Sequence, residues 1–383
     1  MRCELPTAPP STVPVVVAGA IASKLGNGGE AWVRMSWMRG LQCLGRDAWL
    51  FEQIADPSPA QVAYFRDVTT WFAAADRSVL VDGSGHPIVC PAGVDPRDVA
   101  ASADVLLNIS GHLRCPELLD RFDRRVLVDI DPGFTQIWHA QGLPGAGVDG
   151  HHAFATIGEN IGRPGCPIPT GGLPWIPTRQ PVVLGDWASE QALGTAAFTT
   201  VASWRGAYGP VDHDGHRYGV KAHEFRKLID LPARVPAARL EIALDIHAGD
   251  DADRTALLTH GWSLTDPTAA SASPAAFRRY VHASAGEVSP AQGLYVATRS
   301  GWFSDRTARY LAAGRPAIVQ DTGFTDTLPT GEGLLAFSDV DGAAHAVQAV
   351  LDDYPRHAAA ARAVAQEHFA PERVLGDLLQ RVL

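Results

Sequence analysis

Cysteine is scarce in this sequence, and long apolar runs are absent from it. The 383 residues include five scattered cysteines and no C-x-x-C pair: Cys3, Cys43, Cys90, Cys115 and Cys166. An odd number of isolated thiols predicts no disulfide framework and fits a reducing compartment. No apolar run approaches the roughly 20 residues of a membrane-spanning helix, and no basic segment leads into an apolar signal core. The sequence therefore predicts a soluble, cytoplasmic protein without an integral membrane span.

Positive charge is also in deficit, and several catalytic motifs are missing. The formal net charge of −10 argues against a general binder of nucleic acids or anionic membranes. There is no Walker A, H-E-x-x-H or G-x-S-x-G segment. The loop Gly26-Asn27-Gly28-Gly29 is not G-x-G-x-x-G, which disfavours a nicotinamide dehydrogenase. His213-Asp214-Gly215-His216 lacks further Cys or His at zinc-site spacing, so we interpret it as a loop and predict no metal.

What is present is a regular alternation of apolar runs and helical patterns. Pro14–Ala20 reads as a central parallel strand, and a helical period follows over Glu30–Leu44. Further strands are predicted at 48–51, 103–110, 125–131, 181–184, 199–204, 239–246, 277–282 and 317–319. This order predicts an α/β protein with doubly wound parallel sheets, whose binding groups lie at the carboxyl ends of the strands.

The length of the chain predicts two domains, because 383 residues exceed one ordinary hydrophobic core. A Pro/Gly-rich stretch, 158–181, has the composition of a long loop or an approach to a second domain. We place the boundary near residue 190, which gives domains of 1–190 and 191–383. The tail 343–383 is Ala-rich and predicts helices, with a break at Pro371.

The most informative segment is a short helix near the C-terminal end, flanked by clear start and stop signals. Ser304 or Asp305 can cap its start, and Gly314 followed by Pro316 ends it before the apolar run 317–319. Helix starts carry free amides and partial positive charge, and therefore hold phosphates. Arg306 in the first turn opposes this dipole unless an anion sits there, so the pattern predicts a phosphate.

The same segment resembles the nucleotide-sugar motif of GT-B glycosyltransferases. The resemblance is carried by Leu311-Ala312-Ala313-Gly314-Arg315-Pro316-Ala317-Ile318-Val319. It implies two Rossmann-like domains facing a cleft, with the last helix crossing back to the first domain. It also implies a nucleoside-diphosphate sugar as co-substrate, with no cofactor, and a donor diphosphate at Ser304, Asp305, Arg306 and Thr307. Gly301 and Arg309 occupy the positions of a glutamate pair in the retaining branch, so retention and a glutamate–ribose contact do not carry over.

Other expected donor contacts follow the strands of the second domain. Arg205 and Lys221 are candidates to neutralise the leaving diphosphate, and each could equally be a solvated surface cation. His282, Glu287 and Ser289 are candidates for the nucleoside, although Glu287 could instead be a carboxylate of a solvated turn. In the first domain, Asn27, Gly28 and Gly29 are expected to face the acceptor or the donor phosphate, the alternative being a tight turn.

A catalytic base is expected from the first domain, because the acceptor hydroxyl loses a proton as the new bond forms. His112 follows a predicted strand end, and Asp131 is the rival candidate. The pair His151-His152 is a third choice, and a structural role for a strand-end histidine remains open. No enzymic base is needed if the reaction retains configuration.

These observations predict a glycosyltransferase of hexosyltransferase type that moves a sugar from a nucleoside-diphosphate sugar to a small-molecule or saccharide acceptor. Natural-product or saccharide biosynthesis would be the setting, and a homodimer is compatible with it. A nucleotide-sugar epimerase of the same fold is the first alternative. A binding protein with a degenerate site is the second.

Overall fold

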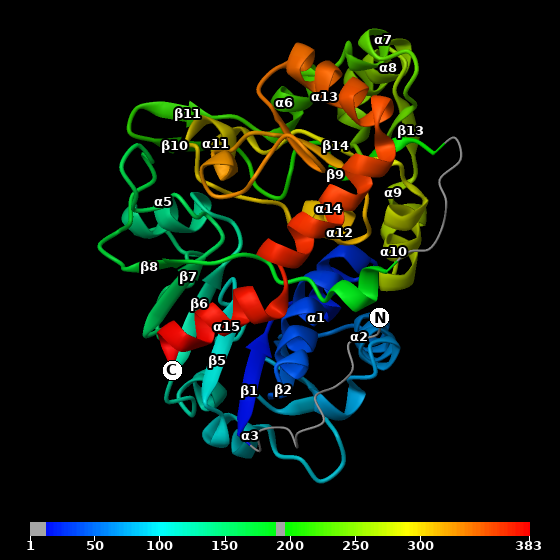
Figure 1. The fold of residues 1–383 in the computed structure, drawn as a ribbon. Helices are drawn as coiled ribbons and strands as arrows, with labels where there is room; N and C mark the ends of the chain where they lie inside the picture. Colours follow the sequence, from blue (N-terminus) through cyan, green and yellow to red (C-terminus); the bar gives the residue numbers. More distant parts are fainter. Residues whose placement is uncertain (1–12, 189–195) are drawn as a thin grey trace. The chain divides into compact units, whose positions relative to one another are not determined.

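The computed structural model describes residues 13–188 and 196–383 and divides into two compact units (Figure 1). Of the described residues, unit 1 contains 13–162, 169–186 and 369–383, and unit 2 contains 163–168, 187–188 and 196–368. Cys3 and the predicted boundary near residue 190 lie outside the described residues. The chain changes unit between Asp186 and Trp187, and it returns to unit 1 at Phe369.

Unit 1 is built on an eight-stranded sheet with the order β4-β3-β2-β1-β5-β6-β7-β8. Its strands are β1 (Pro14–Ala18), β2 (Asp47–Gln53), β3 (Ser78–Val81), β4 (Pro87–Val89), β5 (Val105–Ile109), β6 (Arg125–Asp129), β7 (Ala153–Thr156) and β8 (Trp175–Pro177). Only the β3–β4 pair is antiparallel among the strand pairs of this sheet. The helices are α1 (Gly28–Cys43), α2 (Pro59–Trp71), α3 (Pro96–Ser102), α4 (Pro116–Leu119), α5 (Phe134–Ala140) and α15 (Pro371–Val382), with 3₁₀ turns η1 (Ala22–Lys24), η2 (Ala75–Arg77) and, where the chain leaves the unit, η3 (Leu184–Trp187).

Unit 2 is built on a six-stranded parallel sheet with the order β13-β12-β9-β14-β15-β16. Its strands are β9 (Phe198–Ser203), β12 (Leu240–Asp245), β13 (Ser263–Thr265), β14 (Gly286–Ser289), β15 (Ala317–Gln320) and β16 (Leu334–Phe337), and a separate hairpin pairs β10 (Val211–His213) with β11 (His216–Tyr218). The helices are α6 (Lys221–Lys227), α7 (Leu231–Arg234), α8 (Asp251–Thr259), α9 (Pro267–Ser271), α10 (Pro274–Ala283), α11 (Gly293–Ala297), α12 (Asp305–Ala312), α13 (Val340–Asp352) and α14 (Tyr354–His368), with 3₁₀ turns η4 (Ala248–Asp250) and η5 (Phe324–Asp326).

Both sheets reverse their strand order at one point, as in Rossmann-like folds. In unit 1 the order reverses between β1 and β5, and in unit 2 between β9 and β14. Ligands of open α/β sheets bind outside the carboxyl ends of the strands at this switch point. The prediction of an α/β fold with two doubly wound sheets is confirmed, and the two switch points are where functional residues are sought below.

Two strand predictions are wrong. Residues 277–282 form part of α10 and not a strand, because Ser273 caps the helix and Pro274 occupies its first turn. Residues 181–184 form no strand; the Val182 N–H donates to the Phe369 carbonyl, and η3 follows. The segment 213–216, predicted as a loop, connects the strands of the β10–β11 hairpin, in which His213 pairs with His216.

The last helix belongs to unit 1 and packs against its first helix. In Figure 1, α15 is red and α1 is dark blue. The two approach closely at Gly40, where a Cβ atom would lie 2.6 Å from Leu375 Cδ1. A glycine at this position therefore lets the two backbones come together.

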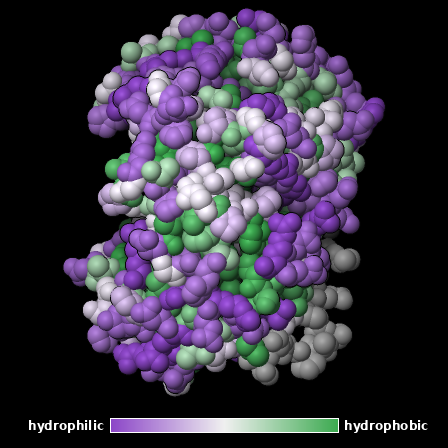
Figure 2. Space-filling view, turned by 90° about the vertical axis from the view of Figure 1, so that its left-hand side faces the viewer, coloured by the Kyte–Doolittle hydropathy of each residue, from purple (hydrophilic) through white to green (hydrophobic). Residues whose placement is uncertain are grey.

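The apolar side chains of the central strands are buried in the core of each unit. In unit 1, β1 is buried throughout, and in unit 2, β14 and β15 are buried throughout. Hydrophilic residues cover much of the face in Figure 2, with hydrophobic residues in smaller areas. Among the described residues, no helix is long and apolar enough to cross a membrane, and all four cysteines are free thiols.

Candidate functional site

The start of α12 is open in the way that an anion site requires. Ser304 occupies the N-cap position, but its hydroxyl accepts no capping hydrogen bond from the helix. The preceding loop is fixed instead by Thr322, whose carbonyl accepts from the Gly301 N–H and whose hydroxyl donates to the Trp302 carbonyl. Gly314 ends the helix with a φ of 67°, as predicted. The first-turn amides of α12 thus remain available for a ligand.

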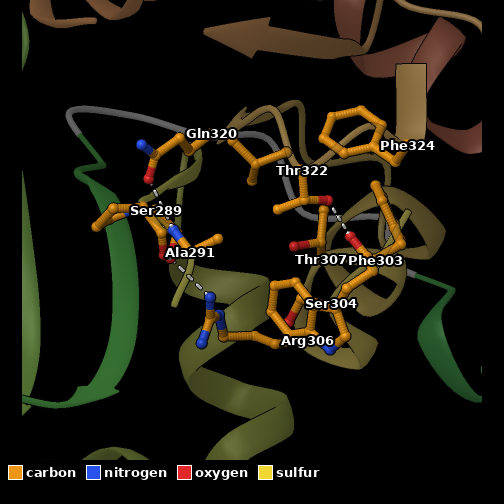
Figure 3. Close-up of a pocket in the computed structure, with 12 residues that line it drawn as sticks. Ser289, Ala291, Phe303, Ser304, Arg306, Thr307, Gln320, Thr322 and Phe324 are labelled. Carbon is orange, nitrogen blue, oxygen red and sulfur yellow. Dashed lines mark hydrogen bonds between the residues drawn. The ribbon is translucent and has the colours of Figure 1, made fainter. Parts of the chain in front are cut away.

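A pocket lies at this helix start, at the carboxyl ends of β14 and β15 (Figure 3). It measures about 250 Å³, open solvent included, and is lined by Ser289, Pro290, Ala291, Trp302, Phe303, Ser304, Arg306, Thr307, Val319, Gln320, Thr322 and Phe324. Three of the four residues predicted for the diphosphate, Ser304, Arg306 and Thr307, line it together with Ser289. Asp305 accepts a hydrogen bond from Arg309.

Arg306 lies across the switch point of unit 2. Its Nε donates to Glu287 Oε1 (2.6 Å), its Nη1 to the Val201 carbonyl (2.8 Å) and its Nη2 to Ser289 Oγ (2.7 Å). The charge that predicted a phosphate therefore already has a carboxylate partner within the protein. Because a guanidinium carries five N–H groups, two remain for a ligand at the pocket wall that Arg306 forms.

Lys221, the first residue of α6, carries the most unusual charge of this region. Its side chain is half-buried, and its ammonium group makes no hydrogen bond or ion pair with any described residue. The Nζ atom lies 5.6 Å from the centre of the Phe225 ring. Burial, followed by the nearby Arg306, lowers the pKa of Lys221 to about 7, although Glu287 and Asp305 oppose the shift. A half-buried cation beside a second cation favours the binding of an anion.

Arg205, the other predicted diphosphate ligand, has a different environment. It forms a bidentate pair with Asp250, at 2.8 and 2.9 Å, and its side chain is 63% exposed. The charged groups that act on Lys221 are Arg306, Glu287 and Asp305. The structure therefore brings Lys221 and Arg306 together, and it engages Arg205 in an exposed ion pair.

The residues predicted for the nucleoside separate in the structure. His282 lies near the end of α10, before the amino end of β14, and its ring stacks on Trp187. Glu287 is a fully buried partner of Arg306 and not the carboxylate of a solvated turn. Ser289 ends β14 and lines the pocket. The structure thus keeps Ser289 at the site, corrects the environment expected of Glu287, and removes His282 from the pocket.

The pocket contains residues that the sequence had not singled out. Gln320, at the end of β15, accepts from the Ala291 N–H through Oε1 and donates to Glu224 through Nε2 (2.7 Å). Trp302 stacks on Tyr295 with ring centres 4.6 Å apart. The signal for Gln320 was its place at the carboxyl end of a predicted strand, whereas the ring pair of Trp302 depends on packing that a sequence does not show.

In unit 1, the predicted loop and base candidates gather at strand ends. The Asn27 side chain caps α1 by accepting from the Glu30 N–H, so Gly28 and Gly29 form the first turn of a helix. His112 follows β5 and Asp131 follows β6. Burial, followed by Arg34 and Lys24, lowers the pKa of His112 to about 3, which keeps its imidazole neutral near pH 7.

The pair His151-His152, the third choice of base, and the aspartate near Asp131 contact other side chains of unit 1. His151 shares a 3.1 Å contact between its Nε2 and Asn108 Nδ2, and His152 contacts Arg125. Asp129, close to Asp131, is buried and accepts from Thr135, Gln136 and Thr156. Within the described ranges, no group of three or more His, Cys, Asp or Glu side chains could hold a metal ion.

Solved structures of glycosyltransferases are similar to this chain over almost its whole length. An alpha-glucosyltransferase in complex with UDP and a 13-mer DNA is 9% identical, with a TM-score of 0.62, over 96% of this chain and 98% of that one. HepE from Anabaena, with UDP and glucose, is 10% identical, with a TM-score of 0.56, over 96% and 99%. The pneumococcal O-GlcNAc transferase GtfA, with UDP and GlcNAc, is 8% identical, with a TM-score of 0.58, over 97% and 98%.

No protein-family model and no curated protein sequence matches the chain. At 8–10% identity the structural likeness shows the fold, and it confirms the GT-B architecture that the segment around α12 predicted.

Proposed function

We propose that this protein is a glycosyltransferase that takes a sugar from a nucleoside-diphosphate sugar bound to unit 2. The observation that carries the proposal is the ammonium group of Lys221, which has no partner among the described residues and lies beside Arg306. The open start of α12 supplies free amides at the pocket that Arg306 lines. Two cations and a helix start at the switch point of a GT-B fold support a diphosphate site.

The proposed chemistry uses these groups on the leaving diphosphate. The bond between the anomeric carbon of the sugar and the diphosphate oxygen breaks, and a bond from that carbon to the acceptor oxygen forms. Negative charge grows on the departing diphosphate, where Lys221, the two remaining N–H groups of Arg306 and the amides of Asp305–Thr307 stabilise it. The acceptor proton passes to a base, for which His112 and Asp131 remain our candidates.

Uracil is the first base to test, because the similar structures named above are complexes with UDP. We propose a small molecule or a saccharide as acceptor, near the loop Asn27–Gly29. The DNA in one similar structure belongs to that protein. For this chain, a net charge of −10 supports a different acceptor.

The first experiment is a thermal-shift titration of the full-length protein with a panel of nucleoside diphosphates and nucleotide sugars. A ligand at a hundredfold its Kd adds about 2.7 kcal/mol, or roughly 5–10 °C for a unit of this size. We expect one nucleotide, with UDP the first candidate, to stabilise the protein. If no nucleotide shifts the transition, the proposal fails. Conversion of a nucleotide sugar without an acceptor would identify an epimerase, and binding without any turnover would identify a degenerate site.

The affinity for a nucleoside diphosphate is expected to fall as the pH rises above 7. The pKa of Lys221 is lowered to about 7 in the free protein, mainly by burial, and a bound diphosphate raises it. Between these two pKa values binding takes up a proton, so Kd rises by up to about tenfold per pH unit. The nucleotide itself stays ionised in this range.

Calorimetric titration with UDP from pH 6.5 to 9.5 measures this effect. Lys221→Gln removes the titrating group and should give a Kd that is almost independent of pH above 7. A wild-type Kd that is constant between pH 7 and 9 would show that the Lys221 ammonium does not contact the ligand.

A further inference from the structure

A second cluster of charged residues lies in unit 1, where β1 and β5 end. Lys24 belongs to η1, Glu30 and Arg34 to α1, and His112 follows β5. The order of the sheet reverses between β1 and β5, so the cluster occupies the switch point of this unit. The donor pocket described above belongs to unit 2 and uses none of these residues.

Arg34 is the most deeply buried member of the cluster, and its donors are not all used. Its side chain is 2% exposed, and its Cγ would lie 2.5 Å from a Cβ atom at Gly19, so a glycine is needed to seat it. Its Nη1 donates to the carboxylate and the carbonyl of Glu30. Its Nε is buried and has no hydrogen-bond partner among the described residues. Buried donors are rarely left unpaired, so this guanidinium indicates an acceptor that comes from elsewhere.

His112 presents an unpaired ring beside this guanidinium. The imidazole is half-buried and forms no hydrogen bond with the described residues. The turn that carries it contains two successive left-handed residues, Ser110 with φ 53° and Gly111 with φ 63°. A positive φ is unfavourable at a serine, and such conformations cluster at functional sites. The neutral ring can therefore donate one hydrogen bond to a ligand.

The charges of the cluster do not cancel. Lys24, Arg34 and Arg114 act on His112 as cations, and Glu30 is the one carboxylate that acts with them. Three cations against one carboxylate leave an excess of two positive charges in a chain whose net charge is −10. Lys24 is exposed, and its ammonium group, like the imidazole of His112, forms no hydrogen bond or ion pair with the described residues.

We propose that this cluster binds an oxyanion, a phosphate or carboxylate group carried by the acceptor. Arg34 and Lys24 supply the positive charge, and His112 donates one hydrogen bond from its ring. Glu30 holds Arg34 through Nη1, and the Nε–H of Arg34 has no partner among the described residues. The assignment of the oxyanion to the acceptor rests on the proposed glycosyltransferase function, whereas the binding of an oxyanion at this site does not.

The test follows the His112 ring signals of ¹³C-histidine-labelled, full-length protein during titration with inorganic phosphate at pH 7.5. The signals are assigned by their absence in His112→Asn. We expect a saturable shift in the wild type, a Kd at least about tenfold weaker in Arg34→Gln, and about threefold weaker in Lys24→Gln. Arg46→Gln is the matched control, since Arg46 belongs to unit 1 but pairs with Asp104. Its Kd should equal that of the wild type.

Two outcomes overturn the site. Either the His112 signals do not respond to phosphate or to malonate, or Lys24→Gln and Arg46→Gln weaken binding equally. Should Arg34→Gln fail to fold, the comparison of Lys24→Gln with Arg46→Gln decides, because the Lys24 side chain is exposed and its loss leaves the core intact.

A second titration in saturating UDP separates the two sources of an oxyanion. If phosphate still shifts the His112 signals while UDP is bound, the result supports an oxyanion that belongs to the acceptor. UDP that itself shifts His112 and displaces phosphate assigns the oxyanion to the donor, and overturns our assignment. If no nucleotide of the panel binds, the glycosyltransferase proposal fails, while the phosphate result in unit 1 stands by itself.

Discussion

Replacement of Lys221 by glutamine is expected to lower kcat/KM for sugar transfer by about 10²–10³-fold, with a much smaller effect on the Kd for the nucleotide sugar, whose diphosphate has not yet gained the charge of the leaving group. Glutamine keeps a polar side chain of similar length and removes the charge. In the proposed mechanism that charge faces the diphosphate, which becomes more negative as the bond to the sugar breaks. An interaction that strengthens in the transition state affects kcat more than ground-state binding.

The structure explains why this lysine is suited to the role. Its ammonium group has no hydrogen-bond partner among the described residues. Burial of the side chain, followed by the charge of the nearby Arg306, lowers the pKa of Lys221 to about 7. A cation that already has a carboxylate partner would first have to exchange it. Lys221 has no such partner to give up, and an arriving diphosphate relieves its unfavourable environment.

The matched control is Arg226→Gln on the same helix, because Arg226 pairs with Asp253 and is 47% exposed. It should retain activity within about twofold of the wild type, as expected for an exposed ion pair. Initial rates of UDP release with a fixed acceptor measure both variants. If Lys221→Gln keeps more than a tenth of the wild-type kcat/KM, the ammonium group does not stabilise the leaving diphosphate.

The parts of the fold that were predictable from sequence are those set by local signals. The helix α12 was predicted because Ser304, Gly314 and Pro316 mark its ends independently of the rest of the chain. The same kind of signal was overlooked at α10, where Ser273 and Pro274 begin a helix over residues that had been assigned to a strand. Phe277 and Val281, four positions apart, are both buried, which is the spacing of a helix face.

The partners of the site residues were not predictable, because they come from distant parts of the chain. The sequence marks Arg306 as unusual at a helix start, but its carboxylate partner is Glu287, 19 positions earlier on strand β14. Arg205 matched Lys221 in the sequence pattern, and only the fold shows that Asp250 engages it. Charge and spacing therefore singled out the candidate residues, while tertiary packing determined which of these cations are engaged by carboxylates of the protein.

Simultaneous replacement of Arg306 by methionine and Glu287 by leucine is expected to preserve stability and to weaken UDP binding at least about tenfold. Glu287 is fully buried, Arg306 is 14% exposed, and their atoms Oε1 and Nε lie 2.6 Å apart. Removal of Glu287 alone leaves a nearly buried guanidinium without its carboxylate, which should cost about 3–5 kcal/mol of unfolding free energy. Removal of both charges leaves apolar groups of similar volume, a change that is often neutral or stabilising.

Urea unfolding of the four proteins in this cycle, together with UDP titrations, separates the two roles of the pair. We expect the single variants to be less stable than the double variant, with a coupling energy of roughly 2–3 kcal/mol. Substitutions at uninvolved surface positions change the free energy of unfolding by less than about 0.5 kcal/mol. If Glu287→Leu changes it by no more than this, the pair is not needed to satisfy buried charge.

The double variant decides what the pair is for. If it is as stable as the wild type but binds UDP at least about tenfold more weakly, the loss cannot be assigned to unfolding. Arg306 is then retained for its place at the β9–β14 switch point, where Glu287, Ser289 and the Val201 carbonyl orient it and leave two N–H groups for the diphosphate. Unchanged UDP binding in a stable double variant would show instead that Lys221 and the α12 amides bind the diphosphate without it.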